Sequence, residues 1–195
     1  MSTSHTHMLK SMPFYVMKKP TIINVMRVMT LDHTIPLEEV HRAFPNITKL
    51  YRGRPEMLLM KMKNGRNVQL FRGGKAQILG RVNDADAASM RLECVEKLQT
   101  MSTMRQVRVT TMNQSNLVIS VRLEKALSLQ KIASIDSDFF YETELFPAAL
   151  IRTWHPVHIS VFHTGTLIFT GLKSVKQLDT LLPDVISCLK SKHIL

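Results

Sequence analysis

The sequence predicts an α+β fold built from two similar repeats. The motif F-x-x-G-x5-G begins at Phe71 and again at Phe162, displaced by 91 residues. The same offset carries Phe146 back onto Pro55, and each of these two residues precedes an apolar run. In each half the patterns follow the order strand, helix, strands, helix. An offset kept at four positions, with the same order of elements, is typical of a duplicated structural unit.

Composition indicates a globular chain. Of the 195 residues 45% are hydrophobic and 21% are charged, which is ordinary for a folded domain. No apolar run reaches the ~18 residues of a membrane span, so no membrane partner is expected. Cys94 and Cys188 lie in helix-like segments, one per repeat, and we expect both to be reduced, buried apolar side chains.

The net charge of +11 favours a polyanionic partner. The charge is unevenly distributed, with +9 in residues 1–105 and +2 in residues 106–195. Basic proteins do not all bind nucleic acid, so charge alone leaves the partner open.

The first repeat follows a polar segment, residues 1–19, which we expect to be a basic, mobile tail. Pro36 is placed to start a short helix, and Asn64-Gly65 is a strong hairpin signal. In the last helix, Ala87, Met90, Cys94 and Leu98 fall at spacings of three and four, so they should form one buried stripe. The predicted elements are strand 21–31, helix 37–44, strands 57–62, 68–71 and 76–79, and helix 84–99.

The second repeat has the same order. We expect a strand within 106–121, a short helix over 123–130, two or three strands between 148 and 169, and a last helix over 174–190. Pro183 lies inside that helix and predicts a kink or a break. The chain is therefore divided into the tail 1–19 and the repeats 20–105 and 106–195.

Nothing in the sequence indicates an enzyme. His155, His158 and His163 match no metal-ligand spacing, and Gly73-Gly74-Lys75 is a turn with a cation, not a phosphate-binding loop. We therefore expect no catalytic residue, no metal and no cofactor.

The stretch from Tyr141 to Pro147, reading YETELFP, resembles the second repeat of the TATA-box-binding protein core. The resemblance continues through Leu150-Ile151-Arg152 and runs without a gap from Gly171 to Lys190. It is weaker but continuous over residues 20–99. It implies a saddle, in which both repeats form one curved antiparallel sheet with its concave face on DNA and four helices on the convex face. Proteins of that family enter the minor groove and kink the duplex with apolar wedges.

The resemblance also implies roles for individual residues. Asn24 matches one of two asparagines that contact the central base pairs, although it also fits an ordinary polar residue of an edge strand. Phe71 and Phe162 match wedges, although both also fit buried strand residues. The implied wedges are Phe71, Phe146 and Phe162 with Pro55 and Pro147. The implied groove residues are Asn24, Met26, Gln69, Gln77, Leu79, Thr110, Met112, Ile168 and Thr170. The implied phosphate contacts are Arg54, Lys61, Arg66, Lys75 and Arg152.

The sequence departs from the family mostly in the first repeat. Pro55 stands in place of a wedge, Glu56 brings a carboxylate towards phosphates or groove, and Gln69 and Gln77 replace apolar groove residues. Thr110 stands in place of the second asparagine. We therefore expect weaker sequence selectivity than in the family and an affinity that falls steeply with salt.

The acidic loop of the second repeat resembles the site that receives transcription factor IIB in the family. Glu142, Glu144 and Leu145 are the matching residues, although two exposed glutamates also fit a solvated loop. The predicted function is that of a transcription initiation factor that binds and bends A·T-rich promoter DNA. The expected protein partners are factors like transcription factors IIB and IIA and the RNA polymerase machinery.

Two other functions remain open on the sequence alone. The polar substitutions in the first repeat fit an adaptor or competitor that binds initiation factors with little DNA binding. An accessory domain of a nuclease or glycosylase would need a catalytic domain, for which no chain is left over. The resemblance further implies that the free protein can form a homodimer, and that it acts in the nucleus or at a viral transcription site in an infected cell.

Overall fold

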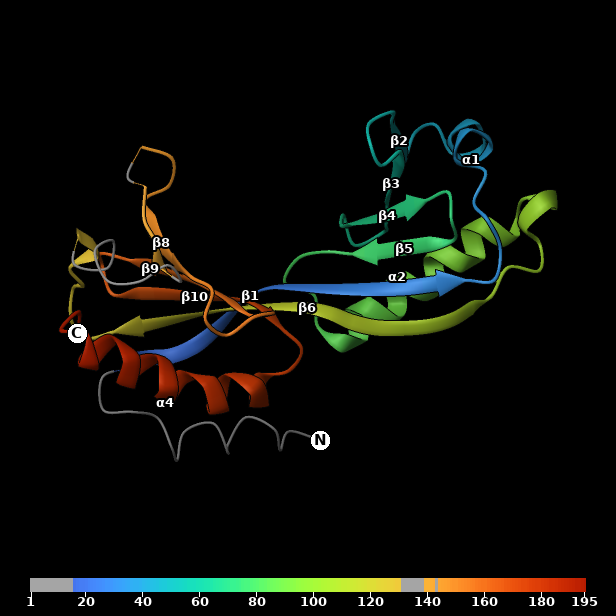
Figure 1. Cartoon of the computed structure of the whole chain (residues 1–195). Helices are drawn as coiled ribbons and strands as arrows, with labels where there is room; N and C mark the ends of the chain where they lie inside the picture. Colours follow the sequence, from blue (N-terminus) through green and yellow to red (C-terminus); the bar gives the residue numbers. More distant parts are fainter. Residues whose placement is uncertain (1–15, 131–138, 143) are drawn as a thin grey trace. The chain divides into compact units, whose positions relative to one another are not determined.

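A computed structural model describes residues 16–130, 139–142 and 144–195 of the chain. Ten strands form a sheet in the order β2-β3-β4-β5-β1-β6-β10-β9-β8-β7 (Figure 1). The strands are β1 (Val16–Leu31), β2 (Thr48–Tyr51), β3 (Met57–Lys61), β4 (Asn67–Phe71), β5 (Lys75–Ile78), β6 (Val109–Leu123), β7 (Phe139–Phe140), β8 (Ala148–Ile151), β9 (His158–Phe162) and β10 (Thr166–Leu172). The α-helices of the described part are α1 (Leu37–Ala43), α2 (Asp84–Gln99) and α4 (Val175–Ser191), and a 3-10 turn, η2, spans Ser102–Met104.

The residues form two compact units by their contacts, and each is described here by itself. Unit 2 is Asn24–Ser115, and unit 1 comprises Met1–Ile23 and Asn116–Leu195. The strands β1 and β6 contribute residues to both units.

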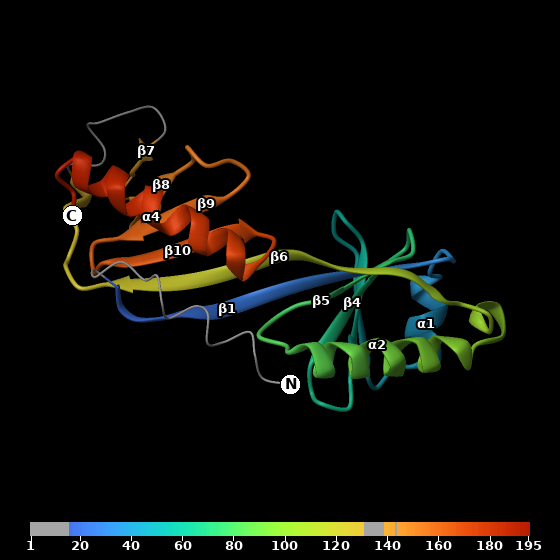
Figure 2. The same ribbon diagram turned by 90° about the horizontal axis from the view of Figure 1, so that it is seen from below.

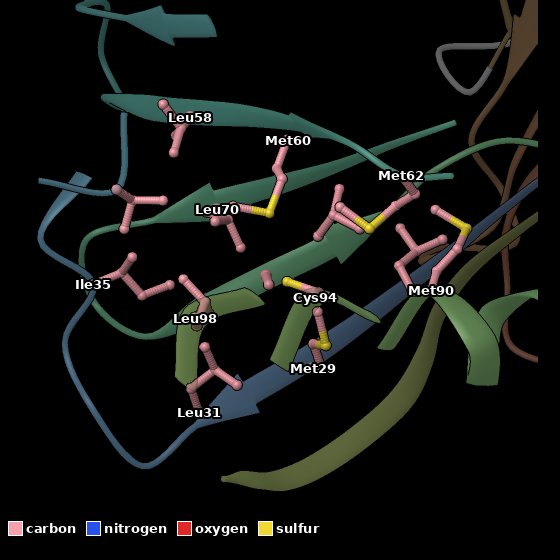
Figure 3. Packing of buried hydrophobic residues seen from close by; sticks show 14 of the residues in the cluster. Met29, Leu31, Ile35, Leu58, Met60, Met62, Leu70, Met90, Cys94 and Leu98 are labelled. Atoms are coloured by element: carbon pink, nitrogen blue, oxygen red, sulfur yellow. The ribbon is translucent and has the colours of Figure 1, made fainter. Parts of the chain in front are cut away.

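In unit 2, the strands alternate between a covered and an open face because successive side chains point to opposite sides. Leu58 and Met60 of β3 and Leu70 of β4 are fully buried on the covered face, where they pack with Cys94 and Leu98 of α2 (Figure 3). Leu37 and Val40 of α1 belong to the same cluster, so both helices cover the same face of the sheet.

Helix α2 confirms its predicted limits and its buried stripe. It starts after Asn83, whose side chain accepts a hydrogen bond from the backbone N–H of Asp86 at 2.7 Å, as an N-cap residue does. Burial on the stripe raises the pKa of the Cys94 thiol to about 12. The buried residues of the helix are Ala87, Met90, Cys94 and Leu98.

In unit 1, α4 lies across β8, β9 and β10 on one side of these strands (Figure 2). Its N-cap is Ser174, whose hydroxyl accepts a hydrogen bond from the backbone N–H of Gln177. The helix faces the sheet with Leu178, Leu182, Val185, Ile186 and Leu189.

The duplication is confirmed by the strand register. Met57 pairs with Phe71 in unit 2, and Ala148 pairs with Phe162 in unit 1, which keeps the offset of 91 residues. The same strand register therefore occurs in both units.

Several predicted elements differ from the structure. Strand β1 begins at Val16, inside the segment expected to be a tail. The prediction of a helix over 123–130 is wrong at its start, since Leu123 ends β6 and the helical residues begin at Leu129. The residues from 131 to 138 lie outside the described ranges. The break at Pro183 does not occur, since α4 is one continuous helix. Pro183 lies on its exposed side.

No helix in the described part of the chain is both long and apolar enough to cross a membrane. The side chain of Cys94 is buried, as expected, whereas that of Cys188 is half-buried.

Candidate nucleic-acid interface

The open face of unit 2 alternates with the buried positions of the same strands. Asn24, Met26 and Val28 of β1 are half-buried between the buried Val25, Arg27 and Met29. The neighbouring strands add further half-buried side chains to this face, namely Leu59, Gln69, Phe71 and Gln77. Leu79, directly after β5, is half-buried as well.

Asn24 is held in one orientation on this face. Its Oδ1 accepts a hydrogen bond from the backbone N–H of Gly80 at 2.9 Å. Because a backbone N–H can only donate, the oxygen of the amide is identified and the side-chain NH2 group faces away as a donor. A donor on this face is suited to the acceptor atoms that every base pair presents in the minor groove.

Asn116 is the counterpart of Asn24 in unit 1. Its Oδ1 accepts a hydrogen bond from the backbone N–H of Gly171 at 2.9 Å, as Asn24 does from Gly80. The match of Thr110 to the second asparagine of the family is therefore wrong, and Asn116 takes that place. The sequence contained the signal, because Asn24-Val25-Met26 and Asn116-Leu117-Val118 are the same pattern of an asparagine before two apolar residues.

Thr110 and Met112 occupy other surroundings. The hydroxyl of Thr110 donates to the backbone carbonyl of Thr30 at 3.1 Å, so it is engaged along the ladder. Met112 packs against the buried core of unit 2 instead of lying on its open face. Val118, half-buried two residues after Asn116, takes the place expected for Met112.

The two phenylalanines expected as wedges of the second repeat lie together. The ring centroids of Phe146 and Phe162 are 6.1 Å apart with an edge-to-face angle of 63°. Phe146 remains 44% exposed, and Pro147 beside it is also exposed. Such aromatic pairs prefer this geometry, and their exposed area is an apolar surface open to a ligand.

The corresponding place in unit 2 has one ring. Phe71 pairs with Met57 across the ladder and is half-buried, and Pro55 is exposed two residues before Met57. The structure therefore puts Pro55 at the position of Phe146, as the offset predicts, but proline offers less area for stacking.

Ile168 and Thr170 are half-buried on the open face of unit 1, in register with Ser160 and His158. They lie between the buried Leu167 and Phe169. The side chains expected to line a groove are thus half-buried in both units, except that of Thr110, which is exposed. Met112 is half-buried as well, but it packs against the core of unit 2.

The predicted phosphate contacts are side chains on or near the strand ends. Arg54, Lys61, Lys75 and Arg152 are exposed, and Arg66 is half-buried near Gly80. The guanidinium of Arg152 lies 5.9 Å from the centre of the Phe140 ring. None of the five forms an ion pair with another residue of the described ranges.

Glu56 does not point a free carboxylate towards a ligand. It accepts a hydrogen bond from Arg72 at 2.8 Å, and Arg72 also binds Glu38 at 2.8 Å. The hydrogen bonds that Arg72 donates to the Glu56 and Glu38 carboxylates raise the pKa of its guanidinium above its ordinary value. The expectation that Glu56 opposes phosphates is corrected by this pairing.

The loops before β3 and β8 carry opposite charges. In unit 1 the backbone N–H groups of Leu145 and Phe146 donate to the carbonyl of Glu142, and the side chain of Leu145 is 75% exposed beside the exposed Glu144. In unit 2 the corresponding loop exposes Arg52 and Arg54. Within the described ranges, no cluster of three or more His, Cys, Asp or Glu side chains could hold a metal ion.

Comparisons with known proteins define the class. The model of the family described as transcription factor TFIID, or TATA-binding protein, matches residues 111–192. TATA-box-binding protein-like 1 of Entamoeba histolytica is 26% identical over 91% of this chain and 83% of its own length. The TATA-box-binding protein of Sulfolobus acidocaldarius is 25% identical over 78% of this chain and 77% of its own length. The structure of the Methanococcus jannaschii TATA-binding protein superposes with a TM-score of 0.70 at 23% identity, over 88% of this chain and 98% of the other.

The fold is therefore that of the TATA-binding proteins, a class of transcription factors without enzymatic activity. Residues 111–192 of this chain match the TATA-binding protein family, and over most of its length the chain is similar to divergent relatives of that family at 25–26% identity. The predicted family and fold class are confirmed, and so is the expectation that the chain is not an enzyme.

Proposed function

We propose that this protein is a transcription initiation factor that binds and bends A·T-rich DNA through the minor groove, using the open faces of its two units. The edge-to-face pair of Phe146 and Phe162 carries the proposal, because it leaves an aromatic surface exposed on a sheet face without a helix in the described part. Apolar side chains of this kind unstack a base step and kink the duplex in minor-groove binders.

Two further features support the same function. The amides of Asn24 and Asn116 both present donors, which suit the A N3 and T O2 acceptors of the minor groove. The five cations Arg54, Lys61, Arg66, Lys75 and Arg152 are placed for phosphates. If each neutralises one phosphate, log K should fall with log salt with a slope of about −4 to −5.

The test is a fluorescence-anisotropy titration of an A·T-rich duplex against a G·C-rich duplex of the same length, at several salt concentrations. The Phe146→Ala/Phe162→Ala variant should lose the preference for the A·T-rich duplex. Energy transfer between dyes at the two duplex ends should report a bend for the wild type and a straighter duplex for the variant.

Leu92→Ala is the matched control, because Leu92 is an apolar side chain of 55% exposure on helix α2. It should bind and bend the duplex as the wild type does, and thermal melting should show all three proteins folded. Wild-type binding without base preference and without a bend would contradict the proposal.

The acidic loop supports docking of a factor like transcription factor IIB. Leu145 is largely exposed directly after Glu144, and Glu142 and Glu144 are exposed in the same loop, so the loop offers an apolar side chain and negative charge to a basic surface. A factor like transcription factor IIA, the RNA polymerase machinery, a homodimer of the free protein and a nuclear location remain predictions from the family resemblance.

The second candidate function is an adaptor that binds initiation factors with little specific DNA binding. It is favoured by the polar Gln69 and Gln77 on the open face of unit 2 and by Pro55 in place of a wedge. Retained binding of a purified transcription factor IIB protein, lost in Leu145→Ala, together with absent DNA preference would support this alternative.

A further inference from the structure

Two glutamines lie side by side on the open face of unit 2. Gln69 of β4 and Gln77 of β5 are direct partners in the ladder, and both side chains are half-buried. Gln77 is also opposite Val28 of β1, and Gln69 is opposite Leu59 of β3. Across the four strands β3, β4, β5 and β1, the two glutamines therefore lie side by side, with an apolar residue next to each of them.

The amides of this pair are available to a ligand. Neither side chain forms a hydrogen bond with any residue of the described ranges. Their polar atoms are nevertheless not fully buried, because the described part of the chain contains no buried side-chain nitrogen or oxygen without a partner. Each amide offers one carbonyl acceptor and two N–H donors. Water satisfies these groups in the free protein, and a ligand on this face has to replace that water.

The equivalent row of unit 1 is chemically different. Ser160 pairs with Ile168, and Ile168 is also opposite Ser120. The position of Gln77 is therefore taken by an isoleucine, and the position of Gln69 by a serine with a much shorter side chain. The two units present unequal chemistry at the same places of the same ladder.

This difference corresponds to the one distinction that the minor groove offers. A·T and T·A pairs present only the A N3 and T O2 acceptors there, whereas a G·C pair adds the exocyclic N2 donor of guanine. An isoleucine pressed against that amino group removes its water and returns no hydrogen bond, which is costly. A glutamine can accept from the guanine N2 and can equally donate to A N3 or T O2.

We propose that Gln69 and Gln77 let unit 2 accept G·C pairs in the half-site that it contacts, while unit 1 requires A·T pairs in its half-site. This inference rests on the proposed function, since it assumes that the open faces contact a minor groove. It gives the protein an asymmetric site, selective in one half and tolerant in the other.

The test uses symmetric A·T-rich duplexes in which one base pair is changed to G·C in one half, or one in each half, with inosine·C duplexes as controls. Inosine·C lacks the minor-groove amino group and otherwise resembles G·C. Because the protein can bind a symmetric site in either orientation, it should place unit 2 over a single G·C pair. The wild type should therefore bind the singly substituted duplex within about twofold of the parent.

The duplex with one G·C pair in each half should bind roughly tenfold more weakly, since one pair must then lie under unit 1. Inosine in both halves should restore the affinity. In the Gln69→Leu/Gln77→Ile variant, a single G·C pair should already weaken binding about tenfold. Gln106→Leu, which changes an exposed glutamine outside the strands, should behave as the wild type.

A wild-type protein that rejects a single G·C pair, or that accepts one in each half, would overturn the inference, as would an unchanged preference in the double variant. Those results would leave the proposed function intact as long as the parent A·T-rich duplex is bound and bent. Failure to prefer that parent duplex over a G·C-rich one would instead overturn the proposed function itself.

Discussion

Arg27 reaches from the covered face of β1 to Asp84 at the start of α2, with its Nη2 2.6 Å from the carboxylate Oδ1. The arginine is 9% exposed, whereas the side chain of Asp84 is 96% exposed. The other terminal nitrogen of Arg27 donates to the buried carbonyl oxygen of Val82 at 2.8 Å. Losing the hydrogen bond to the buried carbonyl should therefore cost more stability than losing the ion pair with the exposed Asp84.

Arg27→Ala should lower the free energy of unfolding by about 1–3 kcal/mol, because it leaves the Val82 carbonyl without a partner. Asp84→Ala should cost less than about 1 kcal/mol, since an ion pair with an exposed carboxylate contributes little. Urea unfolding followed by circular dichroism measures both. Equal losses for the two variants would show that the ion pair, and not the carbonyl, is the important partner.

Gly74→Ala should destabilise unit 2 by about 1–3 kcal/mol, because Gly74 has a φ of +81° and a Cβ there would lie 2.6 Å from the carbonyl oxygen of His33. Gly73→Ala is the matched control, since a Cβ on Gly73 meets nothing within 4 Å. Thermal melting of both variants checks the prediction. A Gly73→Ala loss as large as that of Gly74→Ala would contradict it.

Asn116→Asp should weaken binding to an A·T-rich duplex at least about tenfold. The substitution keeps an acceptor for the N–H of Gly171 but removes the amide donors and adds a negative charge. Thr110→Asp adds the same charge at the residue first matched to the asparagine, and it should cost less than about threefold. Anisotropy titrations of both variants decide between the two positions, and the reverse order would restore the original alignment.

Asp32 should contribute to acid sensitivity. The backbone N–H of Arg108 donates to its Oδ1 at 2.8 Å, and this bond, with that from His33, lowers the pKa of the carboxyl below its ordinary 3.8. The stabilisation is therefore complete above pH 3.8 and is lost as the pH falls through the lower folded-state pKa.

Asp32→Asn should accordingly flatten the fall in melting temperature below about pH 4, while it lowers the melting temperature at neutral pH. Melting curves recorded from neutral pH down to about pH 2 provide the measurement. Glu96→Gln, which changes an exposed carboxyl on α2, serves as the control. Parallel pH profiles for the wild type and Asp32→Asn would rule out a role for this carboxyl.

Much of the fold could be predicted because its elements have strong local patterns. The stripe of α2 and the turn at Asn64-Gly65 are such patterns. Strand β2 was missed because Thr48–Tyr51 is a short edge strand without a buried residue, and the two residues of β7 are too few for any periodicity. The helix expected from Leu123 started too early because the apolar run of β6 continues to that residue.

The residues of the candidate site could be predicted where a motif fixes their alignment with the family. They could not be predicted along a long strand that contains no such motif. Phe146 and Phe162 were placed by the motif and lie together. Along the 15 residues of β6, no turn or glycine marks the position, so Thr110 was matched in place of Asn116. The hydrogen bond from Gly171 supplies the missing marker. The pairing of Glu56 with Arg72 depends on a tertiary contact that no local pattern reveals.

The charges of the two loops bear on stoichiometry. A duplicated protein with identical loops would offer the same docking place twice, so one molecule would recruit two copies of any loop-binding partner. Here Arg52 and Arg54 occupy one loop, while Glu142 and Glu144 occupy the other. A partner that recognises the charge of one loop would find only one such loop on each molecule, so we expect one copy of such a partner for each molecule of this protein.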